Sequence, residues 1–233
     1  MTSPAIQDYL KIIFKLQHGG QAASTSAIAE KLGVSAASVT GMAKKLSKMG
    51  LATHSPYHGV ALTEEGRGLA LEMIRHHRLL ELYLQKALGF TWDKVDAEAE
   101  RLEHHISEEM EAAMAAFLGD PTEDPHGDPI PTKEGYMPDV RYDRLSEVVP
   151  GKVVRIRRVK DSDPNLLRYL GTLGMYPHVI VEVVDKAPFD GPLVVRVSGA
   201  QQALGAQVTD SIFVEPVEGV YDRGASGYEM EQA

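Results

Sequence analysis

Residues 24–51 read STSAIAEKLGVSAASVTGMAKKLSKMGL, and this stretch decides how the first part of the chain folds. The pattern predicts a short helix capped by Ser26, a tight turn at 33–35, and a second helix capped by Ser35. The residues expected to face inward are Ile28, Ala29, Leu32, Val39, Met42, Ala43, Leu46 and Met49. Two short helices joined by a turn that contains glycine are typical of a helix-turn-helix.

The segments that flank this motif complete a winged-helix pattern. A helix is expected after Ser3, because Pro4 suits the first helical position and apolar residues recur at helical spacing through 6–16. Residues 51–62, LATHSPYHGVAL, read as two short strands around a turn, and a hairpin in this place is a wing. We therefore expect a winged helix-turn-helix domain over residues 1–70.

The rest of the chain divides into a helical part and a β part. Two longer helices are expected at 64–88 and 93–118, and the stretch 119–139, with five prolines, reads as a loop or linker. From residue 143 the apolar period changes to two, and short β-branched segments predict a small β-barrel. The expected fold class is thus mainly α with a small β-barrel, and residues 219–233 are expected to be disordered.

Composition limits the chemistry that the chain can carry. The 233 residues include no cysteine, which excludes disulfides, thiolate metal sites and cysteine nucleophiles. Any metal must then be held by nitrogen and oxygen atoms. No apolar run approaches the length of a membrane span, and the N-terminus does not read as a signal peptide, so we expect a cytoplasmic protein with no membrane partner.

Charge is distributed unevenly around a net value of −9. Residues 1–75 hold 8 basic against 5 acidic side chains, and residues 76–233 hold 16 against 28, so the first part is the one suited to a polyanion. Small side chains are expected near DNA base edges and lysines along phosphates; these are Ser35, Ala37, Ser38 and Thr40, with Lys44, Lys45 and Lys48. The alternative for the lysines is an ordinary solvated face. Few bidentate base contacts are available here, so specificity is expected to depend on DNA shape.

Residues 98–110, EAERLEHHISEEM, carry the first group of candidate metal ligands. Residues three and four apart share a helical face, so Glu100, Glu103 and His104 are expected to point the same way. His105 has different neighbours at these offsets and is set aside. The alternative for this stripe is a solvated helical face.

A second histidine–glutamate pair on the preceding helix favours a metal site. His77 and Glu81 are four residues apart, whereas His76 faces Leu80 and is set aside. Asp8 is an acid among apolar residues of the first helix. Carboxylate oxygens and imidazole nitrogens from three helices suit a divalent cation, with Mn(II) or Fe(II) expected and Zn(II) as a further possibility.

In the order and spacing of these motifs the chain resembles the diphtheria-toxin-repressor family of metal-dependent transcriptional regulators. The segments that carry the resemblance are IQDYLKII at 6–13, the helix-turn-helix at 26–49, RHHRLLE at 75–81, ERLEHH at 100–105 and LGTLGMYPHVIVEVV at 170–184. The resemblance implies a helical metal-binding and dimerisation domain over 71–140 and an SH3-like (FeoA-like) domain over 141–218. It also implies a homodimer that binds double-stranded operator DNA and represses metal-uptake genes.

The resemblance further implies two metal sites. The primary site would comprise Asp8, Glu100, Glu103 and His104, with His77 adjacent or shared. A second site would draw on the helical domain, the linker and the barrel, at Glu81, Asp124, His126 and Asp163.

Within this family the manganese-responsive branch looks closer than the iron-responsive one. Iron-sensing members typically have methionine where this chain has Asp8 and cysteine where it has Glu100, and two carboxylates favour the harder Mn(II). Regulators that bind a close pair of manganese ions carry glutamate where Lys11 stands, which favours two separated sites. Asp96 stands where iron-type members place a histidine, and could join the second site or be solvated.

Other functions fit the sequence less well. A di-metal carboxylate enzyme needs two Glu-x-x-His motifs, and residues 100–104 read Glu-x-x-Glu-His instead, so we do not expect an enzyme. The same regulator answering Fe(II) or Zn(II) stays open. A winged-helix regulator that answers an organic ligand has little support, because the β part shows no marked pocket pattern.

Overall fold

The computed structural model describes residues 2–17, 21–55, 58–189 and 191–217 of the 233-residue chain. They form two compact units. The first comprises Met1–Phe90, Val95–Asp124 and Pro129–Pro138, and the second comprises Thr91–Lys94, Pro125–Asp128 and the chain from Asp139 onward. The disorder expected at 219–233 falls outside the described residues.

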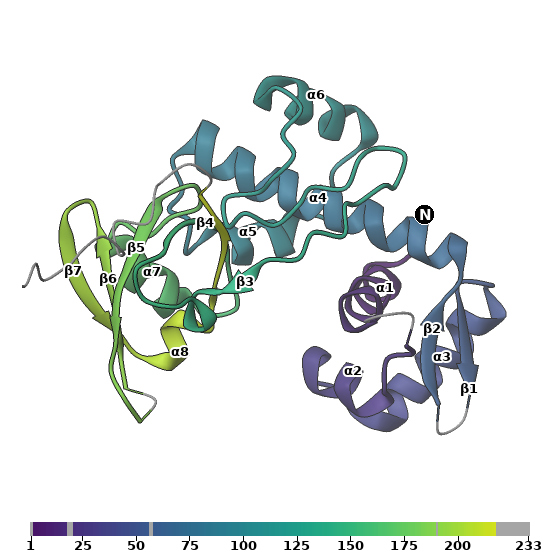
Figure 1. The fold of residues 1–233 in the computed structure, drawn as a ribbon. Coiled ribbons are helices and arrows are strands. Elements are labelled where there is room, and N and C mark those ends of the chain that lie inside the picture. The colour runs from purple at the N-terminus through teal and green to yellow at the C-terminus, as the bar shows by residue number, and fades with distance from the viewer. Residues whose placement is uncertain (1, 18–20, 56–57, 190, 218–233) are drawn as a thin grey trace, which may run out of the picture. The chain divides into compact units, whose positions relative to one another are not determined.

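The first part of unit one is the expected winged helix-turn-helix. Its elements are α1 (Pro4–Leu16), α2 (Thr25–Leu32), α3 (Ala36–Lys48), β1 (Ala52–Ser55) and β2 (Gly59–Leu62), with β1 and β2 paired antiparallel (Figure 1). Ser35 caps α3 as predicted, but the predicted cap of α2 was wrong, because Ser24 rather than Ser26 accepts a hydrogen bond from the Ala27 backbone. The core of this part contains Leu10, Ile13, Ile28, Val39, Leu46 and Val60. Met49, predicted to face inward, is exposed.

A single long helix, α4 (Glu64–Leu88), continues from the wing into the helical part of unit one. It runs without interruption across residue 70, where we placed a domain boundary. Thr63 caps its first turn by accepting a hydrogen bond from the Gly66 backbone, and Gly89 ends it in the left-handed conformation.

The prediction of one helix over 93–118 was wrong, since the structure has α5 (Val95–Leu102) and α6 (Glu108–Leu118) with a turn between them. Ser107 explains the break, because its hydroxyl accepts a hydrogen bond from the Met110 backbone and so caps a new helix. Acidic residues in the first turn of α6 also favour a helix start there. The three helices α4, α5 and α6 bury Leu80, Leu84, Val95, Ala99 and Met114 together.

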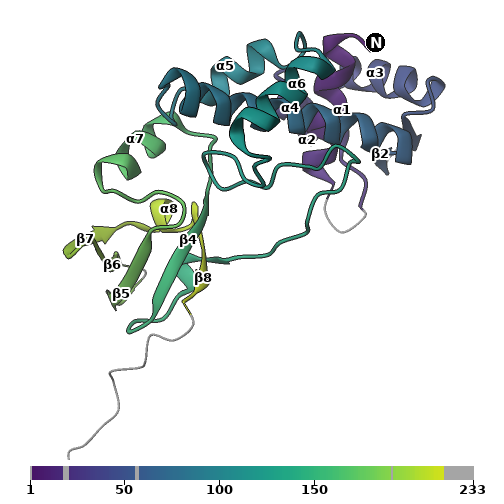
Figure 2. The same ribbon diagram turned by 90° about the horizontal axis from the view of Figure 1, so that it is seen from above.

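The second unit is built on one antiparallel sheet with strand order β3-β8-β4-β5-β6-β7 (Figure 2). Its elements are β3 (Asp143–Arg144), the 3-10 turn η1 (Leu145–Glu147), β4 (Val153–Val159), α7 (Pro164–Thr172), β5 (Ile180–Lys186), β6 (Leu193–Val197), β7 (Ala200–Leu204), α8 (Ala206–Thr209) and β8 (Ile212–Pro216). The four predicted strands appear as β4, β5, β6 and β8. Register shifts within β4 and β5 mark bulges, which bend and twist a sheet.

Two short segments that we placed in the helical domain over 71–140 pack in the second unit instead. Trp92, from residues 91–94, is buried in the core of the sheet. In residues 125–128, the His126 carbonyl accepts a hydrogen bond from the Val159 backbone at 2.9 Å. Gly127 lies so close to the same strand that a Cβ there would meet the Arg157 carbonyl oxygen at 1.9 Å.

In the part of the chain that the structure describes, no helix has both the length and the apolar character needed to cross a membrane.

Candidate metal centre

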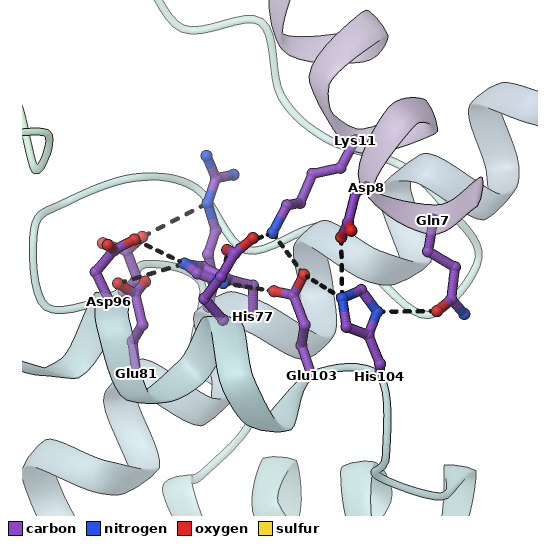
Figure 3. Close-up of polar contacts among 11 residues, drawn as sticks. Gln7, Asp8, Lys11, His77, Glu81, Asp96, Glu103 and His104 are labelled. Atoms are coloured by element: carbon purple, nitrogen blue, oxygen red, sulfur yellow. Dashed lines mark hydrogen bonds and ion pairs between the residues drawn. The ribbon is translucent and has the colours of Figure 1, made fainter. Parts of the chain in front are cut away.

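Glu103 lies at the centre of a cluster of charged side chains in unit one that includes Asp8, Lys11, His77 and His104. Glu103 is 1% exposed. It follows the last residue of α5, and its backbone still donates to the Ala99 carbonyl at 2.9 Å. One carboxylate oxygen, Oε2, lies 2.6 Å from Nδ1 of His77 on α4, and the other, Oε1, accepts a hydrogen bond from Nζ of Lys11 on α1 at 2.5 Å (Figure 3). This one side chain therefore joins three helices.

The first group of potential ligands comprises Asp8, Glu103 and His104, whose ligand atoms lie within 4.8 Å of one another. His104 Nε2 is 2.9 Å from Asp8 Oδ1 and 3.7 Å from Glu103 Oε1. The other ring nitrogen, Nδ1, is 2.9 Å from the side-chain oxygen of Gln7, which can only accept a hydrogen bond, so Nδ1 is the donor. The Gln7 contact thus leaves Nε2 facing the carboxylates, where it could bind a metal.

The second group surrounds His77, which is buried between acids from α4, α5 and the segment after α5. Its Nδ1 lies 3.6 Å from Glu100 Oε2, and its Nε2 lies 3.6 Å from Glu81 Oε1 and 3.3 Å from Asp96 Oδ1. Two sets of three potential ligands result, one with Glu100 and Glu103 and one with Glu81 and Asp96. Asp96, which the sequence left open, is placed against His77.

The four residues expected for a primary site are thus divided between the two groups. Asp8, Glu103 and His104 lie together, while Glu100 lies on the His77 side of Glu103. Between these groups is the ammonium of Lys11, which donates to Glu100 Oε2 at 2.7 Å and to Glu103 Oε1. From the sequence we noted that Lys11 replaces the glutamate of regulators that bind a close pair of manganese ions. We did not predict its contacts with Glu100 and Glu103.

The charges of this cluster stabilise one another. Burial alone would lower the pKa of His77, but its contacts with Asp96, Glu103 and Glu81 outweigh burial and raise that pKa well above 6.5. Burial acts against the charge of Glu103 too, yet His77 and Lys11 hold the pKa of this carboxyl below its ordinary value.

Lys11 and Asp8 respond differently to their surroundings. Burial alone would lower the pKa of the Lys11 ammonium, but the contacts with Glu103 and Glu100 outweigh burial and raise that pKa. For Asp8, at the edge of the cluster, burial is the largest effect and raises the pKa of its carboxyl in spite of His104 and Lys11. The positive charge that balances the cluster therefore comes from Lys11 and His77.

The donor atoms fit a divalent cation that prefers oxygen and nitrogen. Carboxylate oxygens and imidazole nitrogens from different segments of the chain converge within bonding reach of a single ion. When no ion is bound, the carboxylates repel one another unless other positive charges lie near them. The contacts of Lys11 and His77 with these acids meet that requirement in the structure. Asp8, Glu103 and His104 could hold one ion, and His77 with Glu81 and Asp96 could hold another.

The residues expected to form a second site belong to both units. In unit one Glu81 is buried on α4, and Asp124 is buried with its Oδ2 3.5 Å from Arg78 Nε. In unit two His126 is fully buried, with Nε2 2.7 Å from the Trp92 carbonyl oxygen and its ring stacked on the indole. Asp163 caps α7 by accepting a hydrogen bond from the Asn165 backbone. The ligand set of the second site stays a prediction.

The residues expected to contact DNA all lie on α3 or at its start, and most are exposed. Ser35, Ala37, Ser38, Lys44, Lys45 and Lys48 are exposed and Thr40 is partly exposed. Ser35 and Ser38 share a hydrogen bond between their hydroxyls at 2.9 Å, and Thr40 donates to the Ala36 carbonyl. A face of small side chains followed by lysines is therefore available for contact with DNA.

The two histidines that we set aside differ in their surroundings. His105 is exposed. His76 is buried, with Nε2 3.1 Å from Glu111 Oε2, and Glu111 also pairs with Arg75. Since Glu111 lies on α6, this group connects α4 with α6, a structural role that the sequence did not predict.

Comparison with known proteins matches the three parts of the chain in order. Residues 1–60 match the N-terminal DNA binding domain of iron dependent repressors, residues 63–132 match their metal binding and dimerisation domain, and residues 144–216 match the FeoA domain.

Whole proteins match as well. The iron-dependent repressor IdeR of Mycobacterium tuberculosis (strain ATCC 25618 / H37Rv) is 31% identical over 221 residues, which cover 90% of this chain and 96% of IdeR. A solved manganese-dependent transcriptional repressor in complex with manganese is 39% identical, with a TM-score of 0.84, covering 91% of this chain and all of that one. The manganese regulator SloR is 33% identical with a TM-score of 0.71, over 93% of this chain and all of SloR. The chain belongs to the diphtheria-toxin-repressor family, and is a metal-dependent, DNA-binding transcriptional repressor with a C-terminal FeoA (SH3-like) domain.

Proposed function

We propose that this protein represses metal-uptake genes as a homodimer when Mn(II) is bound at Asp8, Glu103 and His104, with Glu100 as a further ligand. The observation that carries the proposal is the convergence of these oxygen and nitrogen donors from α1 and from the end of α5. Carboxylates at both Asp8 and Glu100, with no sulfur ligand, favour a hard ion over a softer one. The manganese-dependent repressors among the solved relatives support the same choice, whereas the iron-dependent name of IdeR keeps Fe(II) as the alternative.

Helix α1 is the element that connects the metal centre to the DNA-binding part. Leu10 and Ile13 on α1 pack in the core of the winged helix with residues of α2 and α3. Asp8 and Lys11 on the same helix reach the segment after α5 (Figure 3). A change at the centre that moves the backbone of Asp8 also moves the helix on which the winged helix is packed.

Asp8 and Glu103 would hold the cation between them, and its positive charge would then connect α1 with the helical part. The metal favours repression only to the extent that it binds the arrangement of the protein that is competent to bind DNA more tightly than the arrangement that is not. A coupling of about 1–3 kcal/mol corresponds to a change of roughly 5- to 150-fold in DNA affinity. In a two-fold symmetric dimer each α3 would read one half of the operator.

Fluorescence anisotropy with a duplex from the protein's own promoter tests this function. The protein is stripped of metal and titrated with no metal, Mn(II), Fe(II) under anaerobic conditions, or Zn(II). The variant His104→Ala removes a ligand, and His105→Ala is the matched control, because His105 is the next residue and is exposed.

We expect Mn(II) to tighten DNA binding in the wild type and in His105→Ala, and to have little effect in His104→Ala. Equal DNA binding with and without every metal would contradict the proposed function. If Fe(II) but not Mn(II) tightens DNA binding, the protein is still a metal-dependent switch, but the ion to which it responds is Fe(II).

A further inference from the structure

Lys11 is a buried lysine in the middle of the candidate metal centre. It is 3% exposed, and its ammonium contacts two carboxylates that would serve a metal, Glu100 at 2.7 Å and Glu103 at 2.5 Å. A buried charge is costly unless it is paired, so this position requires both the lysine and its acids. Glu100 and Glu103 thus form a cation site that the Lys11 ammonium occupies in the structure.

A divalent cation and the Lys11 ammonium need the same oxygen. Glu103 Oε1 faces Lys11 Nζ at 2.5 Å and His104 Nε2 at 3.7 Å, so it is shared between the lysine and the group of Asp8, Glu103 and His104. An ammonium that close to a bound cation would repel it, and the repulsion is strong where water is excluded. Binding of either cation at Glu103 Oε1 therefore weakens binding of the other.

We propose that Lys11 is a tethered counter-ion that competes with the metal for Glu103 and so sets the metal concentration at which the protein responds. The inference rests on the proposed function, because it supposes that a divalent cation binds this group. The lysine stem is flexible and the Glu100 side chain beside it is 51% exposed, so the ammonium can leave Glu103 by turning toward solvent on that side.

Direct measurement of Mn(II) affinity tests the competition without DNA. Unbound Mn(II) is quantified by its electron paramagnetic resonance signal during titration of the metal-free protein. Lys11→Met removes the charge and keeps a long side chain, and Lys11→Arg keeps the charge. Lys15→Met is the matched control, since Lys15 lies one turn later on α1 and is exposed.

Lys11→Met is expected to bind Mn(II) about tenfold more tightly than the wild type or more, because a competing charge is lost. Lys11→Arg and Lys15→Met are expected to stay within about threefold of the wild type. If Lys11→Met does not fold without metal, Lys11→Gln replaces it, since glutamine can still donate to the carboxylates but carries no charge.

The outcomes separate this inference from the function on which it rests. Equal or weaker Mn(II) binding by the uncharged variants, with normal binding by the wild type, overturns the role of Lys11 and leaves the metal switch intact. Tightening in Lys15→Met as large as in Lys11→Met also overturns it, because the effect would then be one of general charge. A wild type that does not bind Mn(II) overturns both.

Discussion

Replacing Glu103 by glutamine should destabilise the metal-free protein, because two buried cations share this carboxylate. Its side chain is fully buried, so water cannot take its place beside Lys11 and His77. Breaking a buried ion pair by removing one partner costs about 3–5 kcal/mol. Lys11 would keep Glu100 at 2.7 Å and His77 would keep Asp96 at 3.3 Å, so we expect the lower end, about 3 kcal/mol.

Urea unfolding of metal-free Glu103→Gln measures this loss. The transition is followed by far-UV circular dichroism, because most of the helical residues described lie in the first unit. Tryptophan fluorescence would report on the second unit instead, since Trp92 lies in its core. Glu30→Gln is the control, because Glu30 is exposed on α2, outside its first turn, and its replacement should change stability by less than about 0.5 kcal/mol. A loss below about 1 kcal/mol in Glu103→Gln would refute the view that this carboxylate holds the metal-free cluster together.

Three further predictions concern other parts of the molecule. The raised pKa of His77 adds stability that is fully present below the unfolded value of about 6.5 and is lost as the pH rises through the higher pKa of the folded state. The urea midpoint of the metal-free protein should therefore fall as the pH is raised above about 6.5, and should fall less in His77→Gln. Lys45→Ala should weaken DNA binding across sequences and reduce the salt slope by about 1, whereas Lys86→Ala, exposed at the end of α4, should leave anisotropy titrations unchanged. Gly127→Ala should destabilise the second unit by more than about 1 kcal/mol, because Gly127 has φ +87° and a Cβ would clash with the Arg157 carbonyl; a Trp92 fluorescence transition identical to that of the wild type would contradict this.

Local signals in the sequence were sufficient for most of the fold. Pro4 at the start of α1 and Ser35 at the start of α3 act within one turn of themselves, so their effect can be predicted without the rest of the chain. The β-branched segments of the second unit likewise predicted four strands. The strand β7 (Ala200–Leu204) was missed, because its sequence AQQAL has no β-branched residue, and pairing with β6 rather than propensity fixes it.

The candidate site was predicted less completely, because its contacts join distant parts of the chain. Helical spacing identified Glu100, Glu103 and His104, but it assumed a continuous helix, and the turn before Ser107 places Glu103 and His104 beyond the end of α5. No rule of spacing connects Lys11 with Glu103, which is 92 residues away. A signal was nevertheless present, since an apolar face of α1 that includes a lysine requires acids opposite it.

Gln7 was missed for a similar reason. It is an ordinary polar residue in the first turns of α1, and its contact with Nδ1 of His104 depends on how α1 packs near the end of α5. Second partners of metal-binding histidines are side chains of many kinds, so residue type alone does not identify them.

The central claim is that metal binding and DNA binding favour the same arrangement of α1, and reciprocal coupling tests it most directly. The Mn(II) affinity of the wild type is measured with and without saturating operator duplex at fixed salt. Because coupling between two sites is reciprocal, DNA should tighten Mn(II) binding by the same factor by which Mn(II) tightens DNA binding, roughly 5- to 150-fold. An Mn(II) affinity that the operator duplex leaves unchanged would contradict the account.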